Sequence, residues 1–250
     1  MIPFTSIYLD DQPIDGRILD IFSHPADRDM AIMFVHGGGW HSGSRAIFHR
    51  IALAFGEQGF ECATTDYRLG GVTVFDQADD ICDALAAFAE DRQQRGRKSH
   101  IVLIGSSAGA HLACLAALRE CERNYRIAGL CLQAAPFTFE PWPDIFPGIW
   151  ESMQKAIGAT YEKAPELYAK ASPVKLLTPH APPFFILHAA NEHMFPFRLT
   201  EVFLERAAEL GVSTQLSIYQ NAEHGFFYAL TRRQQQQAFA DILAFISSLQ

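Results

Sequence analysis

The stretch from which the fold of this chain can be predicted is Gly105-Ser106-Ser107-Ala108-Gly109. The apolar run 101–104 precedes it, and a stretch rich in alanine and leucine, residues 110–118, follows it. A strand, a G-x-S-x-G turn and a helix in this order are typical of a nucleophile elbow. The residue two before the serine and the residue two after it come so close in such a turn that a Cβ would clash, which explains both glycines. The stretch therefore predicts a sharp strand-to-helix turn with Ser107 at its tip.

Such a turn has two consequences for the serine. Its backbone is expected to be strained, with the hydroxyl at the tip of the turn. It also stands at a helix N-terminus, where free N–H groups and the helix dipole favour negative charge. A tight glycine turn that a serine merely caps has the same residues. The motif alone leaves both interpretations open, and the rest of the chain has to decide between them.

Apolar strand patterns alternate with helical patterns along the chain. Strands are expected over residues 17–22, 30–35, 60–65, 101–104, 127–133, 183–187 and 213–219. Helices are expected over residues 45–58, 74–95, 110–118, 149–158, 165–172, 198–210 and 234–249. This alternation predicts an α/β fold, with a doubly wound, mostly parallel sheet of about eight strands and helices on both faces. We expect one domain over residues 1–250.

Composition and charge exclude several classes of protein. A chain of 250 residues, 49% of them apolar, buries a full core without disulfides or metal. The net charge of -8 argues against nucleic acid and against an anionic membrane surface as partners. Five cysteines without a C-x-x-C suit a reducing cytoplasm. The N-terminus has no basic region before Asp10-Asp11, and no apolar run reaches transmembrane length. We expect a cytoplasmic protein without membrane insertion, and a homodimer is compatible with the sequence.

A serine nucleophile needs a base, and histidine is the usual choice because its pKa lies near neutrality. Of the ten histidines, His224 stands out in a polar loop between the last expected strand and the last expected helix. In a doubly wound sheet that loop lies at the carboxyl ends of the strands, on the same edge as the elbow. A histidine of an ordinary surface loop is the alternative. The serine elbow upstream favours the catalytic interpretation.

The base needs a carboxylate to orient it, and elimination indicates which one. The carboxylate should follow the expected strand 183–187, and residues 174–224 contain no aspartate. Three glutamates at helical spacing within residues 201–209 belong to an exposed helix face. Glu223 adjoins the proposed base and is poorly placed to reach its ring. Glu192 remains as the acid, with a solvated loop glutamate as the alternative.

A second motif supplies donors for an oxyanion: His36-Gly37-Gly38-Gly39-Trp40. It follows an apolar strand pattern, as an H-G-G-G motif requires. Glycines let bare backbone N–H groups approach a carbonyl oxygen. We expect the N–H groups of Gly38, Gly39 and Ala108 to form an oxyanion hole, and losing one such donor typically costs ~10²–10³ in rate. His36 is expected to brace the loop through hydrogen bonds. A flexible turn after a strand is the alternative.

Taken together, these motifs resemble the α/β-hydrolase fold. From about residue 32 to the C-terminus the chain has, in order, H-G-G-G-W, D-Y-R-L, G-x-S-A-G, S-P-V, an acid turn and E-H-G-F. The set is similar to the esterase/lipase branch that includes hormone-sensitive-lipase-like carboxylesterases, bacterial feruloyl and acetyl-xylan esterase-like proteins, and arylformamidases. The resemblance implies a nucleophile, a base, an acid and three oxyanion donors: Ser107, His224, Glu192, Gly38, Gly39 and Ala108.

The acid turn departs from that family. The family often has H-G-x-x-D where this chain has His188-Ala189-Ala190-Asn191-Glu192. Alanine replaces a turn glycine, and glutamate is one methylene longer than aspartate. A metal site is the weaker interpretation of the histidines, because there is no H-E-x-x-H and because His188 and His193 are too far apart for one helical face. We expect neither metal nor cofactor.

Aromatic residues gather in the proline-rich segment 136–150. The segment leaves a strand end at the edge that carries the expected site. We expect a short lid-like loop at about residues 136–158 that roofs an apolar acyl or aryl pocket. The expected substrate-binding residues are Trp40, Phe137, Trp142 and Phe146. A packed surface loop without substrate contact is the alternative.

These observations predict a cofactor-free serine hydrolase, a carboxylesterase of the EC 3.1.1 type, that cleaves esters of small or medium acyl or aryl groups through an acyl-enzyme. Its expected partner is a small-molecule ester or amide. An arylformamidase-type amide hydrolase in the same site stays open. A non-catalytic ligand-binding member of the fold also stays open. The sequence does not name the substrate, because fold and triad are shared by many activities.

Overall fold

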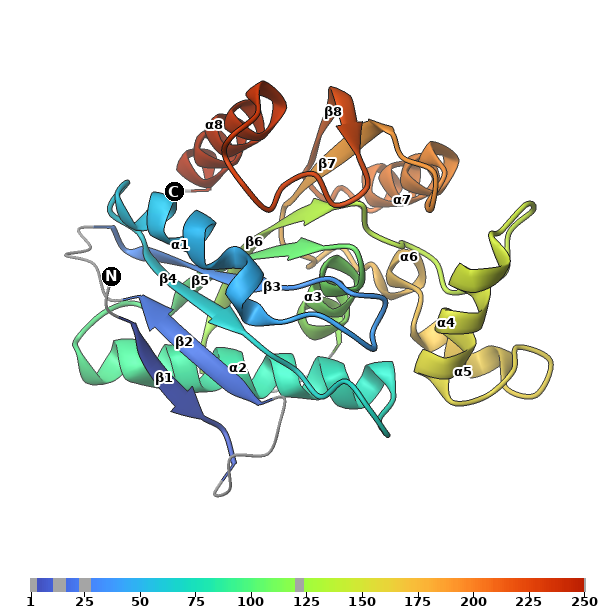
Figure 1. The fold of residues 1–250 in the computed structure, drawn as a ribbon, viewed down its shortest axis with the longest axis horizontal. Helices are drawn as coiled ribbons and strands as arrows, with labels where there is room; N and C mark the ends of the chain where they lie inside the picture. Colours follow the sequence, from blue (N-terminus) through green and yellow to red (C-terminus); the bar gives the residue numbers. More distant parts are fainter. Residues whose placement is uncertain (1–3, 11–16, 23–27, 120–123, 250) are drawn as a thin grey trace.

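Eight strands form one sheet within the part of the chain that the structure describes (Figure 1). The structure is a computed structural model and describes residues 4–10, 17–22, 28–119 and 124–249. Some residues used in the expectations lie outside those ranges. They are residues 1–3 and Asp11 at the N-terminus, and Cys121 among the cysteines. Within those ranges, Cys62, Cys114 and Cys131 are buried free thiols.

The strand order across the sheet is β1-β2-β4-β3-β5-β6-β7-β8. The pairs β1–β2 and β2–β4 are antiparallel, and all other pairs are parallel. The strands are β1 (Thr5–Tyr8), β2 (Ile18–Phe22), β3 (Met30–Val35), β4 (Glu61–Thr65), β5 (His100–Ser106), β6 (Arg126–Gln133), β7 (Phe184–Asn191) and β8 (Thr214–Glu223). The predicted mostly parallel sheet of about eight strands is confirmed.

Helices cover both faces of the sheet (Figure 1). Side chains of α1 and α8 pack on one face, and side chains of α2, α3 and α7 pack on the other. The helices are η1 (Arg45–Phe48), α1 (His49–Gly56), α2 (Val74–Gln94), α3 (Ala108–Leu118), α4 (Pro147–Ile157), α5 (Pro165–Lys170), α6 (Pro173–Leu176), α7 (Phe197–Glu209) and α8 (Arg233–Ser248). None of the helices in the described ranges combines the length and apolar character needed to cross a bilayer.

The two central strands place the two glycine motifs next to each other. Every residue of β3 is buried, and so is β5 from Ile101 onward. Strands buried on both faces have continuous apolar sequences, which is why the pattern predicts them well. Because β3 and β5 are paired in parallel, their carboxyl ends meet at one edge of the sheet. The loop after β3 and the elbow after β5 therefore begin side by side.

The structure differs from the expected strand pattern at three strands. The edge strand β1 is not expected, because none of its four residues is fully buried and the segment has little strand signature. The strands β7 and β8 continue past their expected ends at residues 187 and 219. Backbone pairing continues as far as Asn191 and Glu223, although most of these side chains are exposed. This longer pairing brings the acid turn and the histidine loop next to each other.

Candidate active site

Ser107 stands at the tip of the turn between β5 and α3. Its backbone has φ 54° and ψ −121°, a region that non-glycine residues occupy only under strain. A Cβ on Gly105 would lie 2.6 Å from the Cα of Ala110, and a Cβ on Gly109 would lie 2.2 Å from the carbonyl oxygen of Val35. The first glycine therefore permits the sharp turn. The steric reason for Gly109 differs from the expected one. This glycine is needed because it allows α3 to approach the end of β3.

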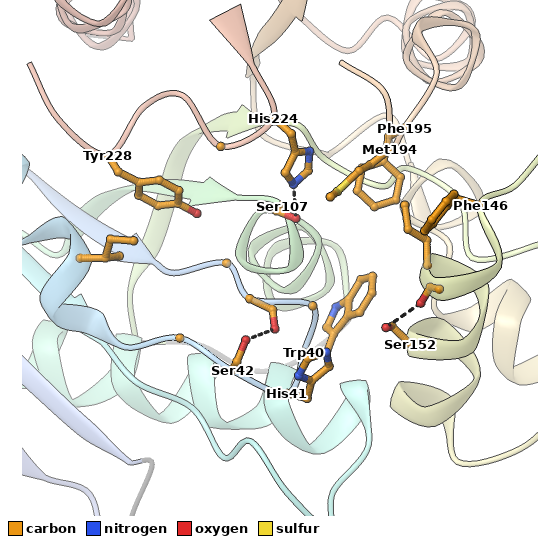
Figure 2. Close-up of a pocket in the computed structure, with 18 residues that line it drawn as sticks. Trp40, His41, Ser42, Ser107, Phe146, Ser152, Met194, Phe195, His224 and Tyr228 are labelled. Atoms are coloured by element: carbon orange, nitrogen blue, oxygen red, sulfur yellow. Dashed lines mark hydrogen bonds between the residues drawn. The ribbon is translucent and has the colours of Figure 1, made fainter. Parts of the chain in front are cut away.

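The imidazole of His224 lies between the hydroxyl of Ser107 and the carboxylate of Glu192. Its Nε2 is 2.9 Å from Ser107 Oγ, and its Nδ1 is 2.8 Å from Glu192 Oε2. Figure 2 shows the ring pointing at the serine from the loop after β8. An ionised carboxylate only accepts hydrogen bonds, so Nδ1–H donates to Glu192 and Nε2 accepts from the Ser107 hydroxyl. In this arrangement the imidazole can take the serine proton.

The surroundings of Glu192 keep its carboxyl group ionised. Its side chain is only 1% exposed. Its Oε1 accepts hydrogen bonds from the backbone N–H groups of Met194 at 2.8 Å and Phe195 at 3.3 Å. Burial acts to raise the pKa of Glu192, but the hydrogen bond and charge of His224 and these two N–H groups outweigh it and lower the pKa below its usual 4.5. A carboxylate therefore faces the imidazole at neutral pH.

The loop after β3 brings Gly38 and Gly39 to the cavity that contains Ser107. Both glycines have positive φ angles, 130° and 61°. A Cβ on Gly38 would lie 2.0 Å from the carbonyl oxygen of Ser42, so only glycine fits there. The Gly38 carbonyl accepts hydrogen bonds from the N–H of Ser42 at 3.0 Å and from its hydroxyl at 2.8 Å, which closes the turn. Ala108 begins α3, so its N–H has no carbonyl partner within the helix.

Two buried histidines support this loop from behind. His36 donates Nδ1–H to the carbonyl of the residue that follows it, at 2.8 Å, which agrees with a bracing role. His111 accepts a hydrogen bond from the indole N–H of Trp40 at 3.2 Å and pairs through Nε2 with the carbonyl of Ala171 at 2.7 Å. Burial lowers the pKa of His111 to about 3. The ring is therefore neutral, and the hydrogen bond from Trp40 fixes which nitrogen carries the proton.

A cavity of about 620 Å³ opens beside Ser107 and His224 (Figure 2). This volume is in the usual range for small-molecule sites. Its wall is mostly apolar and includes side chains from separate segments, among them Trp40, Phe146 and Tyr228. Within the described part of the chain, no Asp, Glu, Lys or Arg lines the cavity. The cavity therefore suits an uncharged ligand.

The structure brings only two of the four expected substrate-binding residues to this cavity. Trp40 and Phe146 line it, and Phe146 is 66% exposed at its mouth. Phe137 and Trp142 line a different hollow, beside α7. Phe137 is 1% exposed and stacks on Phe203 with 4.0 Å between ring centroids. The expectation that Phe137 and Trp142 contact substrate is therefore corrected, because core packing against neighbouring segments occupies both rings.

Several residues of the cavity wall are not expected from the sequence, and three of them lie close to Glu192 or His224 along the chain, namely Met194, Phe195 and Tyr228. Met194 and Phe195 follow Glu192 closely, and Tyr228 lies four residues after His224. Their closeness in the sequence to Glu192 and His224, which the sequence already indicates as site residues, is the signal that could have indicated them. Gln133, whose side chain lies beside the loop after His224, has no comparable signal, because it ends a strand that is apolar from Ile127 to Leu132.

Comparison with known proteins assigns the chain to a family. The BD-FAE family model matches residues 19–206, which is well over half of the chain. The chain belongs to the BD-FAE family. The matched range contains the glycine loop, the elbow and the acid turn, and it ends before the loop that carries His224. The predicted resemblance to the esterase/lipase branch of the α/β hydrolases is confirmed.

Named relatives of this BD-FAE chain are esterases. It is 27% identical over 239 residues to esterase LipC of Mycobacterium tuberculosis. This alignment covers 84% of this chain and 57% of LipC. The chain thus spans little more than half the length of that relative. The native esterase 2 structure of Thermogutta terrifontis shares 25% identity at a TM-score of 0.80, covering 98% of this chain and 92% of that one. Esterase B of Lactobacillus rhamnosis, at 17% identity and a TM-score of 0.84, covers 99% and 85% and shows the fold.

Proposed function

We propose that this chain is a serine hydrolase of carboxylic esters that works through an acyl-enzyme. The observation that carries the proposal is the continuous contact from Glu192 through His224 to Ser107, beside a glycine loop and an apolar cavity. Ser107 Oγ attacks the ester carbonyl carbon while His224 Nε2 takes the hydroxyl proton. The carboxylate of Glu192 stabilises the imidazolium that forms. The esterase names of the relatives support the proposal.

The glycine loop supplies the stabilisation of the tetrahedral intermediate. We assign this role to the N–H groups of Gly38, Gly39 and Ala108, and each donor is worth ~10²–10³ in rate. Collapse of the intermediate breaks the ester C–O bond, and the imidazolium of His224 returns its proton to the leaving alkoxide. A water molecule, deprotonated by the same imidazole, then hydrolyses the acyl-enzyme and regenerates Ser107.

The charge-free cavity wall favours an ester over the amide substrate of an arylformamidase. N-formylkynurenine carries an ammonium and a carboxylate group. Burying these charges without counter-charges is costly, and the described lining residues include no Asp, Glu, Lys or Arg. A protein that only binds ligands has no need of a hydrogen-bonded serine, histidine and carboxylate. The ester is therefore the substrate class that the site supports best.

A hydrolysis panel tests this proposal. p-Nitrophenyl esters of increasing acyl length are offered to the wild type, to Ser107→Ala and to the exposed-serine control Ser247→Ala, next to N-formylkynurenine. We expect ester turnover that falls by at least about 10³-fold in Ser107→Ala and is unchanged in the control. We also expect a kcat/KM for N-formylkynurenine at least about 100-fold lower than for the best ester. Ester turnover that survives in Ser107→Ala would contradict the proposal.

Four further proposals concern the domain organisation, the cellular location, the partners and the oligomeric state of the chain. We propose a single domain over residues 1–250, with the segment 136–158 beside the cavity through Phe146 and α4. A cytoplasmic location is supported by the buried free thiols of Cys62, Cys114 and Cys131. A net charge of -8 supports the absence of nucleic acid as a partner. The homodimer stays a prediction, which light scattering after size-exclusion chromatography tests.

A further inference from the structure

Gln133, the last residue of β6, lies between the elbow and the histidine loop. It is 2% exposed. It is the register partner of Ser106 on β5, so the two side chains stand on the same face of the sheet. Its backbone carbonyl also accepts a hydrogen bond from the N–H of Ser107 at 2.9 Å. The residue is thus joined to the nucleophile turn through its backbone and lies beside it through its side chain.

The side-chain amide of Gln133 connects two catalytic segments. In the amide orientation that satisfies both ends, Nε2 donates to Ser106 Oγ at 3.1 Å. The amide oxygen then accepts from three consecutive backbone N–H groups, those of Gly225 at 3.1 Å, Phe226 at 2.5 Å and Phe227 at 3.3 Å. These three residues directly follow the histidine of the triad. The backbone of that loop therefore curves around a single buried oxygen atom.

We propose that Gln133 is a positioning residue that holds the imidazole of His224 at hydrogen-bond distance from Ser107. This inference rests on the proposed hydrolase function. The loop has a second support, because Gln235 Nε2 donates to the carbonyl of Phe226 at 2.8 Å. That contact fixes the loop to the start of α8, whereas Gln133 fixes it to the nucleophile turn. Tyr228, farther along the loop, also hydrogen-bonds the side chain of Ser106. The Gln133 amide is therefore the contact that joins the residues directly after His224 to the nucleophile turn.

The chemistry of the side chain suggests two informative substitutions. In Gln133→Met the volume is similar, but the three N–H groups lose the amide oxygen that they share, and the loop can shift. The Ser106 hydroxyl loses the amide N–H but keeps its hydrogen bond with Tyr228. In Gln133→Glu a carboxylate oxygen still accepts from the N–H groups, and the Ser106 hydroxyl can donate to it. A misplacement of about 1 Å at a reacting group costs on the order of 10²-fold in rate. The two variants therefore separate loss of the acceptor from loss of the amide.

The experiment measures hydrolysis of p-nitrophenyl butyrate and the rate of labelling by a fluorophosphonate. For Gln133→Met we expect kcat to fall about 10- to 100-fold with KM within about twofold, and labelling to slow by a similar factor. For Gln133→Glu we expect both rates to recover to within about fivefold of the wild type. Phe88→Leu, a change of a fully buried residue of α2, is the control for lost stability alone. It should lower the melting temperature and leave kcat unchanged well below that temperature.

Several results would overturn the proposal. One is a Gln133→Met protein whose kcat and labelling rate stay within about twofold of the wild type. Another is a Gln133→Glu protein whose kcat is as low as that of Gln133→Met. If Gln133→Met does not fold, a kcat of Gln133→Glu more than about tenfold below that of the wild type overturns the proposal instead. Failure of the proposed function gives a different result, namely wild-type turnover that persists in Ser107→Ala. In that case the labelling rates alone decide the role of Gln133.

Discussion

Glu192 determines which nitrogen of His224 carries the proton in the resting site. The carboxylate accepts from Nδ1–H and leaves Nε2 free to act as the base. Glu192→Gln keeps the size of the side chain but removes its charge and allows the wrong tautomer. We expect kcat to fall about 10³- to 10⁴-fold with KM nearly unchanged. Steady-state hydrolysis by this variant and by Glu201→Gln, an exposed control on α7, checks the prediction.

The opposite result would assign the acid role elsewhere. A Glu192→Gln protein with more than about a tenth of the wild-type kcat would show that this carboxylate does not orient the base.

The low pKa of Glu192 has a further consequence for stability. Because its folded-state pKa is below the usual 4.5, the carboxylate contributes stability above that pH and loses it as pH falls through the folded-state pKa.

His111 links the stability of the fold to pH in a measurable way. Its pKa is lowered from 6.5 to about 3 by burial, so below pH 6.5 the unfolded chain binds a proton that the folded chain does not. Stability is therefore lost as pH falls through this window. Between about pH 7.5 and pH 5, the wild type should lose about 2 kcal/mol more unfolding free energy than His111→Gln.

Urea denaturation at the two pH values measures this difference. His36 and His188, whose pKa values burial also lowers, are present in both proteins and therefore cancel in the comparison. An identical pH dependence in the two proteins would show that His111 is not held neutral in the folded state. It would also remove the reason to assign a single tautomer to the ring behind the glycine loop.

The segment between β6 and α5 has two different roles, and substitutions can separate them. Phe146 precedes α4, is largely exposed and lines the cavity, so Phe146→Ala should change the preference among acyl lengths by about tenfold with little change in stability. Phe137 is buried against Phe203, so Phe137→Ala should lower the unfolding free energy by about 3–5 kcal/mol with the acyl preference unchanged. A hydrolysis panel and denaturant unfolding on both variants check this. The reverse pattern would show that the cavity extends to Phe137.

Sequence patterns predict the elements of this fold best where burial is complete. The strand β3 and the central part of β5 are continuous apolar runs, and the steric reason for Gly105 can be stated in advance. The reason for Gly109 cannot, because its neighbour is the distant end of β3. The extended ends of β7 and β8 could not be predicted, because backbone pairing continues after the apolar side chains end. Gln133 could not be predicted either, because its partners are backbone N–H groups of a distant loop. The order of apolar and polar side chains along a sequence does not indicate hydrogen bonds to backbone N–H groups of a distant segment.

The arrangement of the whole molecule explains how distant segments form one site. The elbow follows the central strand β5, and Glu192 and His224 follow the neighbouring strands β7 and β8 at one side of the sheet (Figure 1). Parallel pairing from β3 through β8 puts all of these strand ends at one edge. The antiparallel strands β1 and β2 lie at the other side and extend the sheet. Ser107, Glu192 and His224 thus meet although they are far apart in the sequence.

The central claim is that His224 activates the hydroxyl of Ser107, and covalent labelling tests it most directly. A fluorophosphonate is added to the wild type, Ser107→Ala and His224→Ala, and the modified residue is located by mass spectrometry of peptides. We predict one adduct, on Ser107, in the wild type, none in Ser107→Ala, and labelling slowed by at least about 10³-fold in His224→Ala. A folded wild type that stays unlabelled, or that carries its adduct on another residue, would contradict this account.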